Sequence, residues 1–452
     1  MIRACIKVIG VACCLWPMAL AAQTSSEMAA ILERLDRLER ENRELAKEVQ
    51  ELKSQLATQP AAPPAAPAAP QPAAPSVEER LDIQERRIDE QAQSKVEAEH
   101  KFPVRLTGMV LFNAFLNSRG NDNTDYPTVA APAPERAGGT IRQTIIGLEF
   151  HGPQTFWGGN VHGSLYMDFF TGTAPLAQTF RLRTGDIEIK WKTRGIMVGQ
   201  EKPIFNPREP DSLAYVGFSP LTGAGNLWLW IPQVRVEQDL SFGSTTGVRA
   251  FMGFVQTRET PPYDNTPVPG NLAPSRPGLE GRYELYHKFD DVRHLEIAPG
   301  FHYSITHAGG VSIPSNLFST DWFYNPWRVV EITGVFYTGQ NLSNLGTGAI
   351  NQGYVLYGHH GFAIQSKGGW AQLTLHALPR LDLHIYSGQQ DDRNSQLAAN
   401  DIGKNLVFGA NLFFRIAPNV TLAPEFDQLR TVYIGHGTVI NNRYDLALAY
   451  RF

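Results

Sequence analysis

Hydrophobic and polar residues alternate along short segments of the chain from Phe102 to the C-terminus. Such alternation places apolar side chains on one face of a β-strand and polar side chains on the other. In residues 104–115, one face holds Val104, Leu106, Val110, Phe112 and Ala114, and the opposite face holds Arg105, Thr107 and Asn113. We therefore predict an all-β region over residues 101–452.

Sixteen segments of this kind are expected, beginning near residues 104, 140, 158, 180, 195, 228, 246, 279, 293, 314, 328, 369, 381, 404, 419 and 442. Short turns alternate with longer polar connections near residues 117–139, 203–227, 257–278, 340–368 and 388–404. An even number of antiparallel strands is typical of single-chain outer-membrane barrels, whose apolar side chains face lipid and whose polar side chains line the lumen. A secreted soluble β-protein, with its polar face in water, is the alternative.

Seven tryptophans lie near the ends of the expected strands, namely Trp157, Trp191, Trp228, Trp230, Trp322, Trp327 and Trp370. Outer-membrane barrels carry girdles of aromatic residues at the two membrane interfaces. We therefore expect these side chains to form such a girdle, which favours the membrane barrel over the soluble protein.

The first 22 residues have the features of a secretory signal peptide (residues 1–22). Arg3 and Lys7 supply positive charge, residues 8–20 are mostly apolar, and Ala19 and Ala21 supply small residues for cleavage. All three cysteines of the chain lie in this segment, so the mature protein is expected to contain no thiol, disulfide or thiolate metal site. The chain is therefore expected to leave the cytoplasm.

Residues 23–58 show a heptad pattern that predicts a coiled coil. One core position holds Met28, Leu35, Asn42, Val49 and Leu56, and the second holds Ile31, Leu38, Leu45 and Leu52. Asn42 at a core position restricts register and oligomer state, and it leaves dimer and trimer open. We expect self-association through Leu35, Leu38, Asn42, Leu45, Val49 and Leu52, because a lone helix would expose this apolar seam to water.

Residues 59–75, with the sequence QPAAPPAAPAAPQPAAP, form a low-complexity Pro/Ala linker. A polyproline-like chain rises about 3.1 Å per residue, so the linker is expected to act as a semi-rigid spacer. Ser76 and Glu79 then form a capping-box pattern, which predicts a short charged helix over residues 76–100.

Charge divides the chain at the same place as the hydrophobic pattern. Residues 1–100 contain 12 Lys and Arg against 16 Asp and Glu, whereas residues 101–452 contain 28 of each. The formal net charge of -4, without a basic cluster that carries stacking aromatics, argues against a nucleic-acid partner. Beyond the signal peptide no uninterrupted apolar run reaches the ~18 residues of a membrane-spanning helix, which argues against a helical membrane protein.

Sequence motifs for catalysis or metal binding are not evident. The patterns GxSxG, HExxH and the P-loop do not occur. His359 and His360, the only adjacent pair among 12 histidines, lie in a Gly-rich segment and are expected to be a polar loop feature. We therefore expect no enzymatic activity, no catalytic residue, no metal and no cofactor.

The last nine residues, Tyr444-Asp-Leu-Ala-Leu-Ala-Tyr-Arg-Phe452, resemble the C-terminal signature of outer-membrane barrel proteins, which end in Phe after alternating apolar residues. In those proteins the signature implies recognition by the barrel-assembly machinery, so Tyr450 and Phe452 are the expected signal here. The order of signal peptide, coiled coil, linker and β-region is similar to that of trimeric Gram-negative porins, particularly the DcaP-like family. This resemblance implies a trimer with a periplasmic coiled coil and a preference for dicarboxylates and other anions.

A porin needs no reactive group; it needs an aqueous hole of suitable width and charge. Barrels of about 16 strands leave such a channel, and a loop that folds inward narrows it. We predict this role for residues 203–227, because they follow the fifth expected strand, and the resemblance to porins implies a constriction at the third outer connection. Arg208, Glu209 and Asp211 would then place both signs of charge at the narrowest point. An ordinary surface loop is the alternative.

Strand parity assigns several basic side chains to the lumen. Outward Phe180 and Leu182 put Arg181 and Arg183 inside, and a phase shift near Gly185, interpreted as a bulge, puts Lys190 inside. The same parity assigns Arg105, Arg235, Arg249 and Arg282 to the lumen.

Arginine dominates the basic residues of this region, with 21 Arg against 7 Lys. A guanidinium group matches a carboxylate bidentately, and rings of arginine select for anions in pores. We therefore expect a basic wall that faces acidic loop residues and favours anions. Pairing of these arginines with Glu188, Glu237 and Glu284, which would leave a nonselective channel, is the alternative.

The sequence thus predicts an all-β transmembrane barrel of about 16 antiparallel strands with an N-terminal α-helical coiled-coil extension. Its expected function is that of an outer-membrane porin for small hydrophilic solutes, with carboxylates or dicarboxylates preferred, acting as a homo-oligomer in outer-membrane lipid. The alternative is a structural tether, in which the barrel anchors the N-terminal extension to cell-wall peptidoglycan or to a periplasmic partner.

Overall fold

The computed structural model describes residues 104–171, 178–264 and 277–452. The expected signal peptide (1–22), coiled coil (23–58), linker (59–75) and charged helix (76–100) lie outside these ranges. None of the helices in the described ranges could span a bilayer.

Strands dominate the described residues. They are β1 (Val104–Asn117), β2 (Arg136–Thr140), β3 (Ile145–Gln154), β4 (Asn160–Thr171), β5 (Thr179–Lys190), β6 (Arg194–Glu201), β7 (Ile231–Phe242), β8 (Thr246–Val255), β9 (Gly278–Lys288), β10 (His294–Ala308), β11 (Val311–Trp327), β12 (Val330–Gln340), β13 (Tyr354–Tyr357), β14 (His360–Ala363), β15 (Gln365–Leu378), β16 (Leu381–Asp392), β17 (Ile402–Ala417), β18 (Val420–Tyr433) and β19 (Gly437–Arg451). Three short 3-10 helices, η1 (Phe156–Gly158), η2 (Ser343–Leu345) and η3 (Asn394–Gln396), lie in the connections.

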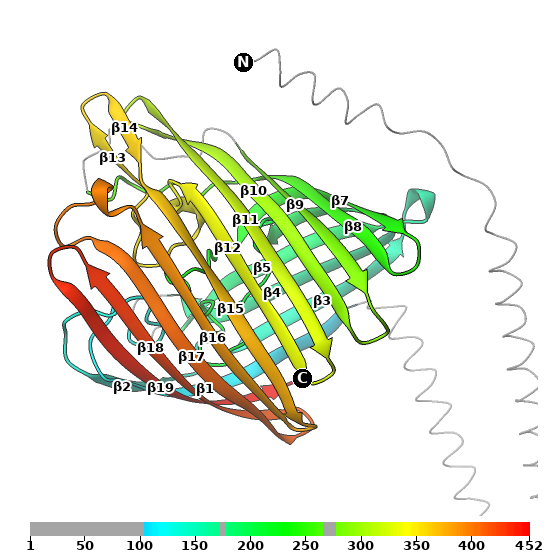
Figure 1. Cartoon of the computed structure of the whole chain (residues 1–452). Coiled ribbons are helices and arrows are strands. Elements are labelled where there is room, and N and C mark those ends of the chain that lie inside the picture. The colour runs from blue at the N-terminus through cyan, green and yellow to red at the C-terminus, as the bar shows by residue number, and fades with distance from the viewer. Residues whose placement is uncertain (1–103, 172–177, 265–276) are drawn as a thin grey trace, which may run out of the picture. The chain divides into compact units, whose positions relative to one another are not determined.

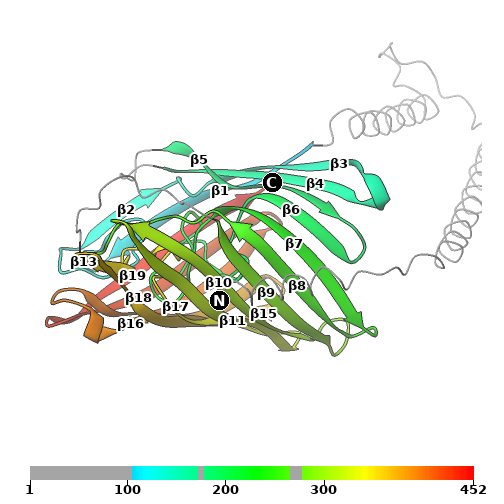
Figure 2. The same cartoon turned by 90° about the horizontal axis from the view of Figure 1, so that it is seen from above.

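The main sheet, which contains all of these strands except β13 and β14, closes on itself. β1 pairs with β19 along Met109–Asn117, and the pairing is antiparallel. The sheet has 17 strands when β2 and β3 are counted separately. Both pair with β1, on either side of a break at residues 141–144, so together they form one interrupted strand of the barrel. The described chain is therefore a closed barrel of 16 antiparallel strands, as predicted (Figures 1 and 2).

Apolar side chains dominate the outer surface of this barrel. On β7, Val234 and Val236 are 49 % and 52 % exposed, whereas the intervening Arg235 faces the lumen. β19 repeats the pattern, with Leu446 exposed and Asp445 buried. A soluble sandwich would bury its apolar face, so this inverted arrangement favours a barrel surrounded by lipid.

Strand connections differ in length between the two ends of the barrel. At one end, which we term the turn rim, every connection is short, and these are residues 155–159, 191–193, 243–245, 289–293, 328–329, 379–380 and 418–419. The other end, the loop rim, also has two short turns, at residues 309–310 and 434–436. The long connections all lie at the loop rim and comprise residues 118–135, 202–230, 256–277, 341–364 and 393–401. The hairpin β13–β14 belongs to the fourth of these connections and extends past the barrel strands (Figure 1).

A register shift on β5 matches the predicted bulge. Leu182 and Thr184 pair with the consecutive residues Met167 and Tyr166 of β4, so Arg183 is the additional residue. Beyond this point the parity is reversed, as the 63 % exposure of Ile187 indicates. The sequence therefore located the phase shift to within about two residues.

The predicted tryptophan girdle is wrong for three of its members. Trp370 points into the lumen and is buried, and Trp228 and Trp230 belong to the connection 202–230 rather than to a strand end at the surface. Trp157 and Trp327 are 87 % and 63 % exposed near the turn rim, where an interface would lie. Parity on β15 explains Trp370, because its odd and even residues face opposite sides of the wall.

Candidate functional site in the barrel lumen

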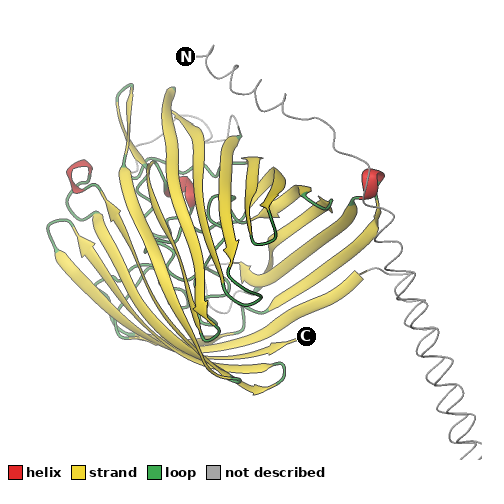
Figure 3. Ribbon diagram, turned by 45° about the vertical axis from the view of Figure 1, so that its right-hand side comes forward, coloured by secondary structure: helices red, strands yellow, loops and turns green. Residues whose placement is uncertain are grey.

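The connection 202–230, which we term the inner loop, runs through the lumen between β6 and β7. Its residues contact inward-facing side chains on strands all around the wall, namely Phe205 with Ser319 of β11, Asp211 with Gln372 of β15, Ser212 with Glu425 of β18, and Leu213 with Asn113 of β1. The candidate segment 203–227 therefore lies inside the barrel, and Figure 3 shows loops within the ring of strands.

An apolar core inside the lumen holds the two ends of the inner loop. It consists of Ile204, Phe205, Leu227 and Leu229 from the loop, Leu342 and Leu345, and wall residues that include Leu317 and Tyr337. Leu342 and Leu345 belong to residues 341–353, the part of the connection 341–364 that precedes β13. Each such side chain contributes about 1.5–3 kcal/mol when it is removed from water. The ends of the inner loop are therefore anchored independently of its polar contacts.

Glycine is required where the inner loop meets its neighbours most closely. Gly225 has a φ of +98°, and a Cβ there would clash with the carbonyl oxygen of Gly369 on β15. Gly346 of the connection 341–353 has a φ of +90°, and a Cβ there would clash with the carbonyl oxygen of Trp228. Any other residue at either position would displace the loop, since it would meet both steric exclusion and backbone strain.

Arg181 and Arg183, two of the predicted lumen arginines, hold the inner loop against β4 and β5. Both contact Oδ2 of the buried Asp168, at 2.6 and 2.9 Å. Arg183 also donates a hydrogen bond to the carbonyl oxygen of Val216 (2.8 Å), and Arg181 donates one to that of Gly217. Two guanidinium groups share one carboxylate, so this trio carries one excess positive charge beside the loop.

Arg208 of the inner loop enters an acidic part of the wall. It contacts Asp321 of β11 (Nε to Oδ1, 2.6 Å) and Glu296 of β10. Arg282 of β9 contacts the same Asp321 and also Glu284, each at 2.7 Å. The prediction of a basic wall that faces acidic loop residues is reversed here, because neighbouring strands place Asp321, Glu284 and Glu296 on the inner face and the loop supplies Arg208.

Glu209, the next residue of the inner loop, pairs with Lys202 at 2.6 Å and accepts a hydrogen bond from Ser219 at 2.8 Å. Burial acts to raise the pKa of Glu209, but the Lys202 ammonium, these hydrogen bonds and the charge of Arg183 together lower it. Glu209 is therefore ionised at neutral pH. Asp211 binds Gln372 of the wall and is 56 % exposed at its side chain.

The other predicted basic residues also lie on the inner wall, mostly beside carboxylates. The paired ones are Arg249 with Glu284 (2.6 Å), Lys190 with Glu188 (2.9 Å) and Arg105 with Glu149 (3.8 Å). Arg235 faces inward opposite Met197 of β6. Ion pairing therefore cancels much of the positive charge that parity alone assigned to the lumen.

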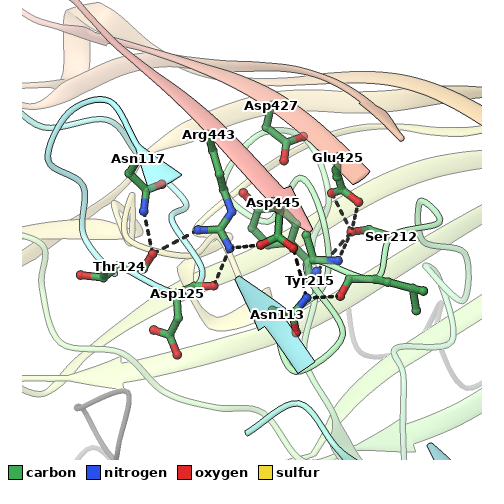
Figure 4. A network of polar contacts seen from close by, with 12 residues as sticks. Asn113, Asn117, Thr124, Asp125, Ser212, Tyr215, Glu425, Asp427, Arg443 and Asp445 are labelled. Carbon is green, nitrogen blue, oxygen red and sulfur yellow. Dashed lines mark hydrogen bonds and ion pairs between the residues drawn. The ribbon is translucent and has the colours of Figure 1, made fainter. Parts of the chain in front are cut away.

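A buried polar network fixes the connection 118–135 to β19 (Figure 4). Arg443 donates hydrogen bonds to the carbonyl oxygens of Thr124 (3.1 Å) and Asp125 (3.2 Å), and it pairs with Asp445 at 2.8 Å. Asn113 of β1 donates to the same Asp445 at 3.2 Å. Arg443 and Asp445 of β19 thus link this strand to the connection 118–135 and to β1.

The same network continues along β18 to the inner loop (Figure 4). The Ser212 hydroxyl lies 2.7 Å from both carboxylate oxygens of Glu425. Tyr386 of β16 lies 2.7 Å from Glu425 and 2.7 Å from Asp427. Glu425, Asp427 and Asp445 are all buried, so three carboxylates share the neighbourhood of one guanidinium group.

Sequence reasoning missed two parts of this site. The connections 118–135 and 341–353 also fold inward, and all three residues of η2 in the latter are buried. Leu342, Leu345 and Ile350 were the available signal, because apolar side chains in a polar connection need a buried partner. Strand parity also assigns the acidic side chains of Asp168 and Asp321 to the inner face, as it does the arginines.

No protein-family model matches the chain, and no curated protein matches it. Among the solved structures that resemble it in fold are two outer-membrane channels. The outer membrane channel DcaP of Acinetobacter baumannii superimposes with a TM-score of 0.65 at 17 % identity, over 77 % of this chain and 97 % of that one. The anion-selective porin from Comamonas acidovorans gives a TM-score of 0.54 at 12 % identity, over 77 % and 99 % of the two chains. The closed 16-strand barrel of this chain is thus that of the outer-membrane porins, and its fold is DcaP-like.

Proposed function

We propose that the chain forms a water-filled channel in a Gram-negative outer membrane, through which small hydrophilic solutes diffuse. The observation that carries this proposal is the inverted barrel, with charged side chains inside and apolar side chains outside. The fold shared with the DcaP channel supports it. The inner loop would act as the constriction, because it narrows the lumen from within.

Planar-bilayer recording tests this function directly. The purified full chain, added to a bilayer in KCl, should produce discrete conductance steps, and liposomes that contain it should swell in small sugars. A folded barrel that gave neither steps nor swelling would contradict the proposal. Folding is checked on the same preparation by the change in gel mobility on heating.

A preference for anions such as carboxylates is the finer proposal. It is supported by Arg181 and Arg183, which both pair with Asp168 and leave one positive charge beside the inner loop, since the nearby Glu209 is paired with Lys202. The fold is also that of the anion-selective porin from Comamonas acidovorans. The ion pairs elsewhere on the wall point to a weak preference, because they neutralise the other arginines.

Removing this excess charge should reduce the anion preference. The variant Arg181→Gln/Arg183→Gln/Asp168→Asn removes one net positive charge without leaving a buried carboxylate unpaired. We expect the anion-to-cation permeability ratio at low ionic strength to fall about fivefold, since a unit charge about 8 Å away in water stabilises an anion and destabilises a cation by about 0.5 kcal/mol each. The reversal potential in a KCl gradient measures this ratio. Lys192→Gln, at an exposed turn-rim position, is the control, and an equal shift in both variants would contradict the prediction.

We also propose a homo-oligomer, a trimer, assembled through the predicted coiled coil 23–58, with Tyr450 and Phe452 as the signal for the barrel-assembly machinery. Deletion of residues 23–100 separates assembly from tethering. Loss of trimers with normal solute flux would assign the segment to assembly. Loss of envelope integrity with trimers and flux intact would support a tether to peptidoglycan, and unchanged behaviour would remove both roles.

A further inference from the structure

The outer face of β15–β18 carries a row of charged residues near the loop rim. Strand register places Lys367 opposite Asp391 and Asp391 opposite Lys404. Arg430 lies opposite Leu406, two residues along β17 from Lys404. These side chains point outward, because the residues that flank each of them on its strand are buried on the lumen side.

A cleft of about 810 Å³ adjoins this row of charges on the barrel exterior. Polar and basic residues of β11, β12, β15 and the end of β16 line it, including Asn316, Gln340, Gln365, Lys367 and Arg393. Arg393 donates a hydrogen bond to Gln365 at 2.6 Å. The volume of the cleft is within the range of small-molecule sites, which is about 300–1,000 Å³.

Toward the turn rim, the same outer face is apolar. Phe336, Ile385 and Phe408 are exposed there, each by more than 40 %. The Arg430 guanidinium carbon lies 5.3 Å from the ring centre of Phe408. A row of cations therefore stands directly above a band of apolar side chains, on the side of the barrel that faces lipid.

The charge of this face is positive. Two acids line the cleft: Asp391 is paired with Lys404 at 3.4 Å, and Asp392 is buried and bound by Gln352 at 2.8 Å. Lys367, Arg393 and Arg430 supply three further cations. Guanidinium and ammonium groups bind phosphate through charge-assisted hydrogen bonds, and basic residues at an anionic membrane surface strengthen binding to it. An amphiphile with a phosphorylated polar head and apolar chains matches both parts of this surface.

We propose that the outer face formed by β11–β18 near the loop rim binds a phosphorylated glycolipid of the outer leaflet. Its phosphates lie against Lys367, Arg393 and Arg430, its sugar occupies the cleft, and its acyl chains lie along Phe336, Ile385 and Phe408. The inference rests on the proposed orientation of the barrel in the outer membrane, with the long connections on the outside.

Native mass spectrometry of the detergent-purified full chain tests this site, with diphosphoryl lipid A as the probe. The variant Lys367→Gln/Arg393→Gln/Arg430→Gln should bind lipid A at least about tenfold more weakly, because it removes three cation–phosphate contacts. The control Lys192→Gln/Arg328→Gln/Arg380→Gln removes the same charge from exposed positions at the turn rim. It should bind as the parent chain does.

The outcomes separate this site from the channel itself. Equal lipid A binding by the two triple variants would overturn the site, as would equal binding of a phosphate-free analogue by the parent chain. If the variant loses its oligomers but still binds lipid A, the face instead contacts a second copy of the chain. That result would also overturn the lipid site. Single-channel conductance, measured on each preparation, should stay unchanged, since these residues lie outside the lumen.

Discussion

Shortening the inner loop should raise the single-channel conductance several-fold. The change replaces residues 208–225 with a short Gly-Ser linker. The two cut ends already lie together, because Asn206 donates hydrogen bonds to Asn226 (3.1 Å) and to the carbonyl oxygen of Leu227 (2.6 Å). Ile204, Phe205, Leu227 and Leu229 remain to fill the apolar core. The segment removed crosses the lumen, so its loss widens the path for ions.

Planar-bilayer conductance in KCl measures this effect on barrels that show heat-dependent gel mobility. Tyr357→Ser, on the exposed tip of the β13–β14 hairpin, is the control and should leave the conductance unchanged. A milder variant, Asp211→Ala/Ser212→Ala, removes the side-chain contacts of these two loop residues with the wall, chiefly those with Gln372 and Glu425. We expect it to increase the open-channel noise. Unchanged conductance and noise in both loop variants would contradict a constriction at this loop.

Arg443→Met should lower the free energy of unfolding by about 3–5 kcal/mol, because it leaves buried carboxylates without their counter-charge. Arg443 is fully buried and pairs with Asp445, while Glu425 and Asp427 face the same region. The substitution also removes the hydrogen bonds to residues 124 and 125 of the connection 118–135. Urea unfolding of the detergent-folded chain, followed by tryptophan fluorescence, measures the change.

Two further variants make this stability measurement specific. Arg328→Met, at an exposed position in a short turn, should change the free energy of unfolding by less than about 0.5 kcal/mol. Adding Asp445→Asn to Arg443→Met should recover part of the loss, because it removes one of the unpaired carboxylates. A loss of the same size in Arg328→Met, or no recovery in the double variant, would contradict the assignment of charge balance to Arg443.

The barrel could be predicted because each strand carries its signal locally. Alternation in Val104–Asn117 or Gly437–Arg451 assigns the lipid face without reference to any partner strand. The same parity located the bulge near Arg183. Where local patterns mislead, the error has a physical cause: Leu227-Trp-Leu-Trp-Ile231 alternates like a strand, yet β7 begins only at Ile231 because the preceding residues pack inside the lumen.

The contacts of the lumen could not be predicted from the same patterns. Parity shows that Arg282 faces inward, but it does not show that Asp321, 39 residues away, lies against it. Arg208 meets Asp321 and Glu296 across 113 and 88 residues of sequence. The Arg282 pair depends on the order and register of β9, β10 and β11, and the Arg208 pairs depend on the path of the inner loop. The arginines predicted to form a basic wall are therefore mostly held in ion pairs with inward-facing carboxylates.

Cysteine accessibility on a single strand tests the central claim most directly, namely that alternate side chains face water and lipid. The three native cysteines lie in the predicted signal peptide, so Glu237→Cys and Val236→Cys each introduce one thiol into the expected mature chain. A charged, membrane-impermeant thiol reagent should change the conductance of Glu237→Cys channels and leave Val236→Cys channels unaffected. Modification of Val236→Cys with Glu237→Cys unreactive would contradict the account.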